Sequence, residues 1–120
     1  MNIESFRDIC LSRKCVTEEF PFDEATLVFK VIGKMFALTD VDFFKSVNLK
    51  CDPERALELR EKYPAILPGY HMNKKHWNTI EMDGSISDQI LEELIIHSYE
   101  LVVEKLPKIL KSELENYTEL

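Results

Sequence analysis

The stretch from Pro68 to Thr79 concentrates the side chains best suited to chemistry in this 120-residue chain. It holds two histidines, two lysines, two asparagines, a tyrosine and the only tryptophan, and no acidic residue occurs between Gly69 and Ile80. Cations beside aromatic rings and amides are the groups that hold a nucleic-acid backbone and stack against its bases. Residue types alone favour a simpler interpretation, an amphipathic strand with Trp77 in the core and the lysines in water.

Other patterns that support catalysis or metal binding are weak. His71 and His76 lie five residues apart, on opposite faces of a regular strand, and no carboxylate cluster adjoins them, so we expect no metal site. Geometry permits a catalytic Cys–His pair, but Cys10 and Cys51 fall on predicted buried faces, where thiols are usually inert. There is no glycine-rich phosphate loop and no G-x-S-x-G motif. We therefore expect no enzymatic activity and no cofactor.

The charge is strongly acidic but unevenly distributed. The chain has 22 acidic and 15 basic residues, a net charge of −7, and an acidic protein repels polyanions at long range. The segment from Asp88 to residue 120 holds eight acids and three lysines, whereas four lysines and two acids occur between Ala25 and Cys51. This polarised distribution leaves room for a local basic face.

The length and composition predict a single cytoplasmic domain over residues 1–120. A chain of this size builds one core, and the hydrophobic fraction of 45% is ordinary for a globular protein. No apolar run approaches the roughly 20 residues that cross a bilayer, and the start lacks a secretory signal, so no membrane partner is expected. Three cysteines without C-x-x-C spacing predict reduced thiols.

Hydrophobic periodicity and turn residues predict the elements that position these side chains. Gly33 between two β-forming runs indicates a tight hairpin, and Asp52-Pro53 indicates the start of a helix. The expected order is helix 3–12, strands 16–22, 26–32, 34–39 and 44–51, helix 53–63, loop 65–69, strand 70–82, helix 87–106, and a tail or short helix over 111–120. The expected fold is α+β, with an antiparallel sheet of five or six strands and helices packed on one face, in the order α-β(3–4)-α-β(1–2)-α.

Five segments of the sequence closely resemble the YjbR/MmcQ family, in order and over about residues 6–110. They are Val16–Phe22, Leu27–Ala37, Asn48–Pro53, Pro68–Trp77 and His97–Val102. One departure is Lys14-Cys15, where many relatives have Pro-Gly. The resemblance implies a secretion-chaperone-like (CyaY-like) fold and DNA binding through a double-wing arrangement of sheet and loops. It implies no enzyme activity and no cofactor.

The resemblance also implies which residues would contact DNA, restricted here to basic and amide positions. These are Lys30, Lys34, Lys50, Asn73, Lys74, Lys75 and His76. Because the chain is acidic, we expect that binding to be weak and salt-sensitive. Two alternatives stay open: a protein-interaction or chaperone-like module with an acidic surface, and a small-ligand site around Lys30, Lys50, His71, Asn73 and His76.

Overall fold

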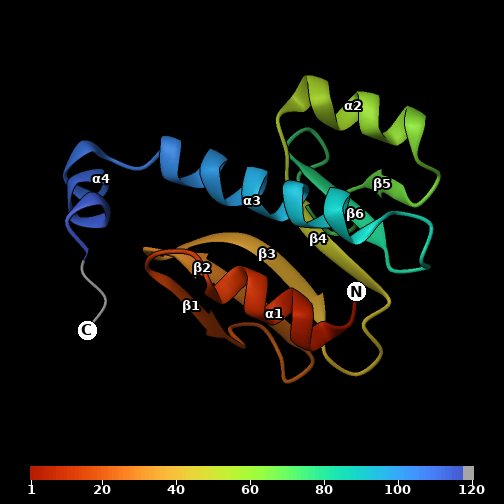
Figure 1. Ribbon diagram of the computed structural model, residues 1–120, viewed down its shortest axis with the longest axis horizontal. Coiled ribbons are helices and arrows are strands. Elements are labelled where there is room, and N and C mark those ends of the chain that lie inside the picture. The colour runs from red at the N-terminus through yellow and green to blue at the C-terminus, as the bar shows by residue number, and fades with distance from the viewer. Residues whose placement is uncertain (118–120) are drawn as a thin grey trace.

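The computed structural model describes residues 1–117 as an antiparallel sheet with helices packed against it (Figure 1). The elements are α1 (Ile3–Leu11), β1 (Val16–Glu19), β2 (Thr26–Val31), β3 (Lys34–Asp40), β4 (Ser46–Lys50), α2 (Pro53–Lys62), β5 (Ile66–Pro68), β6 (Trp77–Glu81), α3 (Asp88–Glu104) and α4 (Lys108–Glu115). The predicted α+β class and element order are confirmed. Of the predicted tail or short helix over 111–120, residues up to Glu115 belong to α4, and residues 118–120 lie outside the described part of the chain.

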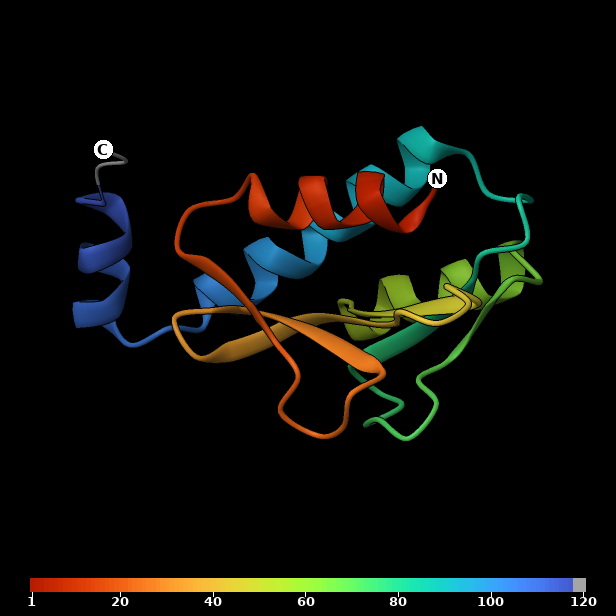
Figure 2. The ribbon, with the colours of Figure 1, turned by 90° about the horizontal axis from the view of Figure 1, so that it is seen from below.

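The sheet has the strand order β1-β2-β3-β4-β6-β5, and all neighbouring strands are antiparallel. Figure 2 shows α1 and α3 on one side of the sheet, as predicted. The main core lies between these helices and the sheet and contains Phe6, Phe29, Phe36, Leu49 and Ile95, each no more than 2% exposed. α2 packs at the β5 edge, where Leu59 and Leu94 line the same small gap.

Local sequence signals explain several element ends. Ile32 and Gly33 both have positive φ, 45° and 79°, which is the geometry of the primed turn that joins twisted strands. The carboxylate of Asp52 accepts the N–H of Arg55 at 3.1 Å and caps α2, and Pro53 occupies its first position. Within residues 1–117 no helix is long and apolar enough to span a bilayer.

The predicted strand over 70–82 is confirmed only from Trp77 to Glu81, and the predicted loop over 65–69 is wrong. Residues 66–68 form the edge strand β5, pairing with Asn78, Thr79 and Ile80, while β6 begins only at Trp77. Residues 70–76 form a loop because Asn73 Oδ1 accepts the N–H groups of both Lys75 and His76, and because His71 adopts a left-handed φ of 58°. The period-two assignment of residues 70–76 to two strand faces therefore does not apply.

The long helix α3 buries one stripe of side chains, and one residue of the predicted stripe differs. Leu91, Leu94, Ile95 and Val102 are buried, whereas Leu101 is only half-buried. Ser87 caps the helix by accepting the N–H of Ile90 at 3.3 Å. The helix ends at Glu104, two residues before the predicted end.

Candidate ligand groove on the open sheet face

The sheet face turned away from α1 and α3, here called the open face, has its own apolar cluster. Val28, Leu38 and Trp77 are buried there, and Met35 and Met72 pack against them. Strand register assigns the side chains, since residues that pair directly across antiparallel strands point to the same face. Val28 pairs with Leu38, Leu38 with Asn48, and Asn48 with Thr79, so these four share the open face.

Two loops border the open face and turn it into a groove. Residues 20–25 and 69–76 protrude from the same side of the sheet in Figure 2. Two cavities of about 630 and 570 Å³ adjoin here and share Ser46, Asn48 and Tyr70. We call the joined cavities the open-face groove.

Aromatic side chains stand exposed along this groove. Phe22 is 65% exposed, Phe43 75% and Tyr70 69%. Phe22 lines one cavity, Phe43 lines the other, and Tyr70 lines both. Gathered exposed rings of this size are typical of a binding surface rather than of a solvated face.

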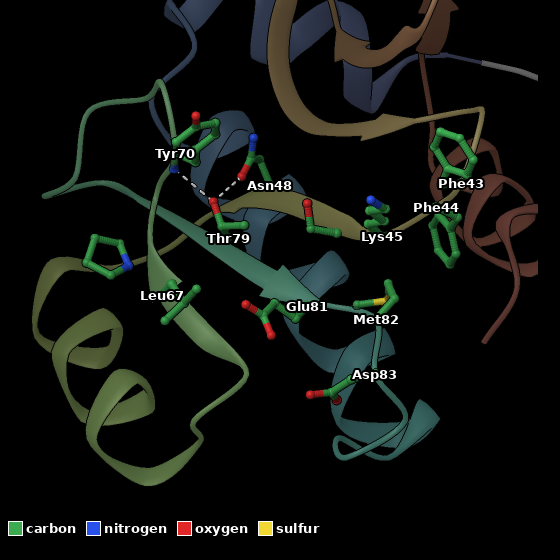
Figure 3. A pocket seen from close by; sticks show the side chains of 12 residues that line it. Phe43, Phe44, Lys45, Asn48, Leu67, Tyr70, Thr79, Glu81, Met82 and Asp83 are labelled. Atoms are coloured by element: carbon green, nitrogen blue, oxygen red, sulfur yellow. Dashed lines mark hydrogen bonds between the residues drawn. The ribbon is translucent and has the colours of Figure 1, made fainter.

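A chain of hydrogen bonds organises the floor of the groove (Figure 3). The N–H of Tyr70 donates to Thr79 Oγ1 at 2.8 Å, and the Thr79 hydroxyl donates to Asn48 Oδ1. The Thr79 hydroxyl thus accepts one hydrogen bond and donates its only proton to the Asn48 oxygen. The amide nitrogen of Asn48 then points away from Thr79, as Figure 3 shows.

The carboxylates near the groove are mostly bound to their own loops. Asp23 accepts the N–H groups of Ala25 and Thr26, and these bonds lower the pKa of its carboxyl group. Asp40 accepts the N–H groups of Phe43 and Lys45. Each of these acids therefore shapes a turn next to the groove, and much of its acceptor capacity is already used.

The predicted strand lysines lie at one end of the sheet, next to the β2–β3 turn, and Lys34 pairs with the main-core residue Val31, so it belongs to the covered face. Lys30 pairs across the sheet with Met35 and forms an ion pair with Glu19. Lys50 pairs with Trp77, and its ammonium lies 6.0 Å from the centre of the Trp77 ring. We call Lys30, Lys34 and Lys50 the lysine end.

Lys50 sits in an electropositive and partly dehydrated environment. Burial lowers the pKa of its ammonium group, and the nearby charges of Lys105 and Lys34 lower it further. No ion pair joins Lys34, Lys50 or Lys105 to an acid within residues 1–117. Like charges held together in this way favour an anion between them.

The 69–76 loop uses several predicted DNA contacts for its own structure. The Asn73 oxygen caps the turn described above, and the Lys74 ammonium donates to the carbonyl of Gly69 at 3.2 Å. Lys75 is exposed, and His76 is half-buried with its carbonyl accepting the N–H of Cys51 at 2.8 Å. Of the predicted loop residues, Lys75 therefore has the most freely placed charge.

Sequence reasoning missed Arg60, which holds this loop from α2. Its guanidinium donates to Asn78 Oδ1 at 2.7 Å and to the carbonyls of Trp77 and Lys74. It also missed Asn48, Phe22, Phe43 and Tyr70 as groove residues. The available signal for Asn48 was its place between Val47 and Leu49, which are buried on the opposite face.

The residues of the predicted small-ligand site do not share one cavity in the structure. His71 lines the open-face groove, with its ring centre 4.1 Å from that of Tyr70. Lys50 lines a separate small gap below α2 and α3. In residues 1–117, no three His, Cys, Asp or Glu side chains gather closely enough to hold a metal ion.

A six-stranded antiparallel sheet with one helix-covered face and one open, loop-bordered face defines the class: a small α+β protein of a single sheet. The YjbR family model matches residues 11–101. The chain belongs to the YjbR family, and the resemblance seen in the sequence is confirmed.

Relatives and solved structures agree with this assignment over most of the chain. The chain is 40% identical to YbdF of Escherichia coli O157:H7 over 106 residues, which is 88% of this chain and 87% of that protein. It is 31% identical to YjbR of E. coli K12, over 90% and 92% of the two chains. The crystal structure of Deinococcus radiodurans DR2400, with a DUF419 domain, superposes with a TM-score of 0.89 at 43% identity. The match covers 99% of this chain and 91% of that one. A crystal structure of a Pseudomonas syringae protein superposes with a TM-score of 0.70 at 29% identity, and the match covers 84% of this chain and 98% of that one.

Proposed function

We propose that this YjbR-family protein is a DNA-binding module that holds the phosphate backbone through the lysine end of its sheet. The observation that supports this most directly is that the charges of Lys34 in β3 and Lys105 after α3 act on Lys50 in β4, with no ion pair from these lysines to an acid within residues 1–117. Phosphate is the anion that such a cluster suits, and lysine binds it as a point charge. The role proposed is binding and not catalysis.

The position of the acidic surface agrees with this proposal. α3 lies on the covered side of the sheet, so its exposed acids Glu92, Glu93 and Glu100 are separated from the open face by the sheet itself, whereas Glu104 directly precedes Lys105 of the lysine cluster. Lys75 is exposed in the loop that borders the open face, two residues before Trp77, which pairs with Lys50. The acidic remainder keeps the affinity modest, on the order of 10⁻⁶ M or weaker at physiological salt. The proposal includes a cytoplasmic location, where Cys10 and Cys51 stay buried, free thiols.

The test is the salt dependence of binding to labelled DNA, measured by fluorescence anisotropy. Each lysine–phosphate contact releases roughly one counterion, so the double variant Lys34→Gln, Lys50→Gln should flatten the slope of log K against log salt by about two units. The control is Lys62→Gln in the last turn of α2, which packs at the β5 edge of the sheet and should leave the slope unchanged. Equal slopes for wild type and the Lys34, Lys50 variant, or no binding at 50 mM salt, would rule out this function.

A protein-interaction role has one specific observation in its favour. Phe20, Phe22 and Phe43 are exposed by half or more, and exposed rings of this kind are common where proteins meet. Binding of that kind would be insensitive to salt, since burying apolar rings releases no counterions. Salt-insensitive capture of a defined partner by wild type, lost in Phe22→Ser and Phe43→Ser, would support this second candidate.

A further inference from the structure

We infer that the open-face groove receives an unpaired nucleobase, which would make single-stranded nucleic acid the preferred ligand. This inference rests on the proposed DNA-binding function and names the form of nucleic acid that the site selects. It follows from the shape of the groove, the arrangement of Tyr70, and the free amide of Asn48.

The shape of the groove suits a base that has left its stack. The cavity of about 570 Å³ lies between the two protruding loops, with Phe22 on one side and Tyr70 on the other. The cavity of about 630 Å³ continues from it between Tyr70 and Phe43. In a duplex the faces of the bases are hidden by stacking, and only their edges are accessible in the grooves. Exposed protein rings can stack only on bases whose faces are free, as they are in single strands.

Tyr70 is exposed, yet its backbone and ring are held in place. Its N–H is bonded to Thr79 on β6, and its ring lies against that of His71 with 4.1 Å between centres. The following residue has a left-handed φ of 58°, a conformation that non-glycine residues adopt rarely. An anchored backbone limits the positions that the ring can take and so lowers the conformational freedom lost when a base stacks on it, which makes Tyr70 a suitable stacking platform.

Asn48 supplies a polar contact for the edge of that base. Its oxygen accepts the Thr79 hydroxyl, and no partner of its amide nitrogen is found within residues 1–117. Asn48 lines both cavities, so the nitrogen is available in the middle of the groove. Its N–H groups can donate to ring nitrogens or carbonyl oxygens of a base.

The groove and the lysine end are adjacent, so one strand can occupy both. Met35 lines the groove and pairs with Lys30 across the sheet, while Lys34 directly precedes Met35. A base in the groove therefore leaves its neighbouring phosphates near the lysine end. The floor residues Ser46, Asn48 and Thr79 are uncharged, and the turn bonds of Asp23 and Asp40 engage their carboxylates. The other charged residues of the groove, Lys45, Glu81 and Asp83, lie at the end of β4 and β6 opposite the Lys50–Trp77 pair.

The first experiment compares a labelled 12-nucleotide single strand with the duplex of the same sequence, by anisotropy at several salt concentrations. Wild type should bind the single strand at least about five-fold more tightly, since stacking of one base is worth roughly 1–3 kcal/mol. Tyr70→Leu should weaken single-strand binding by about 5-fold to 150-fold and leave the duplex affinity and the salt slope unchanged. Phe20→Leu is the matched control, because Phe20 is 50% exposed and lines neither cavity.

The second experiment tests the base contact with a charge-matched pair of variants. Asn48→Asp keeps the acceptor for Thr79 and loses the amide donors, while Asn73→Asp adds the same charge and keeps the acceptor of its turn. The probes are single-stranded homopolymers, each made of a different base. Asn48→Asp should change the order of their affinities, because it removes donors that contact bases. Asn73→Asp should lower all of them alike. The same order in both variants would contradict the role of Asn48.

The outcomes separate this inference from the function on which it rests. The single-strand inference would be overturned if wild type bound the duplex as tightly as the single strand, or more tightly, and if Tyr70→Leu bound like wild type. DNA binding itself would stand in that case if the lysine double variant still flattened the salt slope. Absence of binding to either DNA would overturn both. A second copy of the chain in the groove would appear as an oligomer by sedimentation that Tyr70→Leu dissociates, and that result would also overturn the inference.

Discussion

The buried hydroxyl of Ser98 in α3 accepts the backbone N–H of Lys50 at 2.8 Å. The same hydroxyl donates to the carbonyl of Phe36, the residue that the β2–β3 pairing skips at a bulge. Ser98 thus bridges two backbone groups on neighbouring strands, and it connects α3 to Lys50, a lysine of the proposed DNA site.

Removing this bridge should destabilise the protein. Ser98→Ala leaves the Phe36 carbonyl and the Lys50 N–H without that partner at a site where Ser98 is fully buried, and a buried unsatisfied group costs about 1–3 kcal/mol. Urea denaturation followed by circular dichroism measures the change in unfolding free energy. Ser112→Ala on the exposed side of α4 is the control and should change it by less than about 0.5 kcal/mol. A similar small change for Ser98→Ala would show that water or a shifted strand satisfies both groups.

Leu94 tests the packing of α3 on the sheet. It is 4% exposed and faces the main core, so Leu94→Ala should leave a cavity and lower the unfolding free energy by about 2–5 kcal/mol. The comparison is Leu57→Ala, since Leu57 in α2 is 59% exposed and loses little buried area. If both variants unfold at the same urea concentration, α3 is not packed as the structure shows.

His97 should make the stability depend on pH between neutral and mildly acidic conditions. Its Nε2 accepts the N–H of Asp52 at 3.2 Å, which requires the unprotonated nitrogen. Burial lowers the pKa of His97, and Arg55 lowers it further, while Asp52 and Glu100 act in the opposite direction. Because the folded pKa lies below the unfolded value near 6.5, the unfolded state binds more protons, and the stability present above that value is lost as the pH falls toward the folded pKa.

The measurement is the unfolding free energy of wild type and His97→Gln at pH 7.5 and at pH 5.5. Wild type should lose more stability on acidification than His97→Gln, which has no imidazole to protonate. His71→Gln serves as the comparison because His71 is exposed in the 69–76 loop, and this variant should follow wild type. Parallel pH profiles for wild type and His97→Gln would exclude His97 as the source of the pH dependence.

Lys74 and Lys75 provide the sharpest test of the loop contacts predicted from the sequence. Lys75→Gln should flatten the salt slope of DNA binding by about one unit if its ammonium contacts a phosphate. Lys74→Gln should do the same and should also lower stability, since it removes the bond to the Gly69 carbonyl. Thermal unfolding measured beside the DNA titration separates the two effects. If neither variant changes the slope, the loop does not touch the backbone.

The errors in the sequence-based prediction have a common physical cause. The alternation from Tyr70 to Met82 resembles a strand because period-two polarity says nothing about turns formed by side chains. The Asn73 oxygen accepts two backbone N–H groups, and Arg60 of α2 holds the carbonyls of Lys74 and Trp77. Arg60 is 14 residues from Lys74 in sequence, so only the packing of α2 brings it to the loop.

The sequence by itself determined the elements whose signals are local. The Gly33 turn, the Asp52-Pro53 helix start and the apolar stripe of α3 each depend on residues within a few positions of one another, and together they specify the α+β fold. The tertiary structure decided which sheet face stays open and what gathers on it. Asn48 and Thr79 are 31 residues apart, and their pairing across β4 and β6 both creates the groove floor and orients the Asn48 amide. Strand register and loop placement depend on long-range packing, which no local pattern encodes.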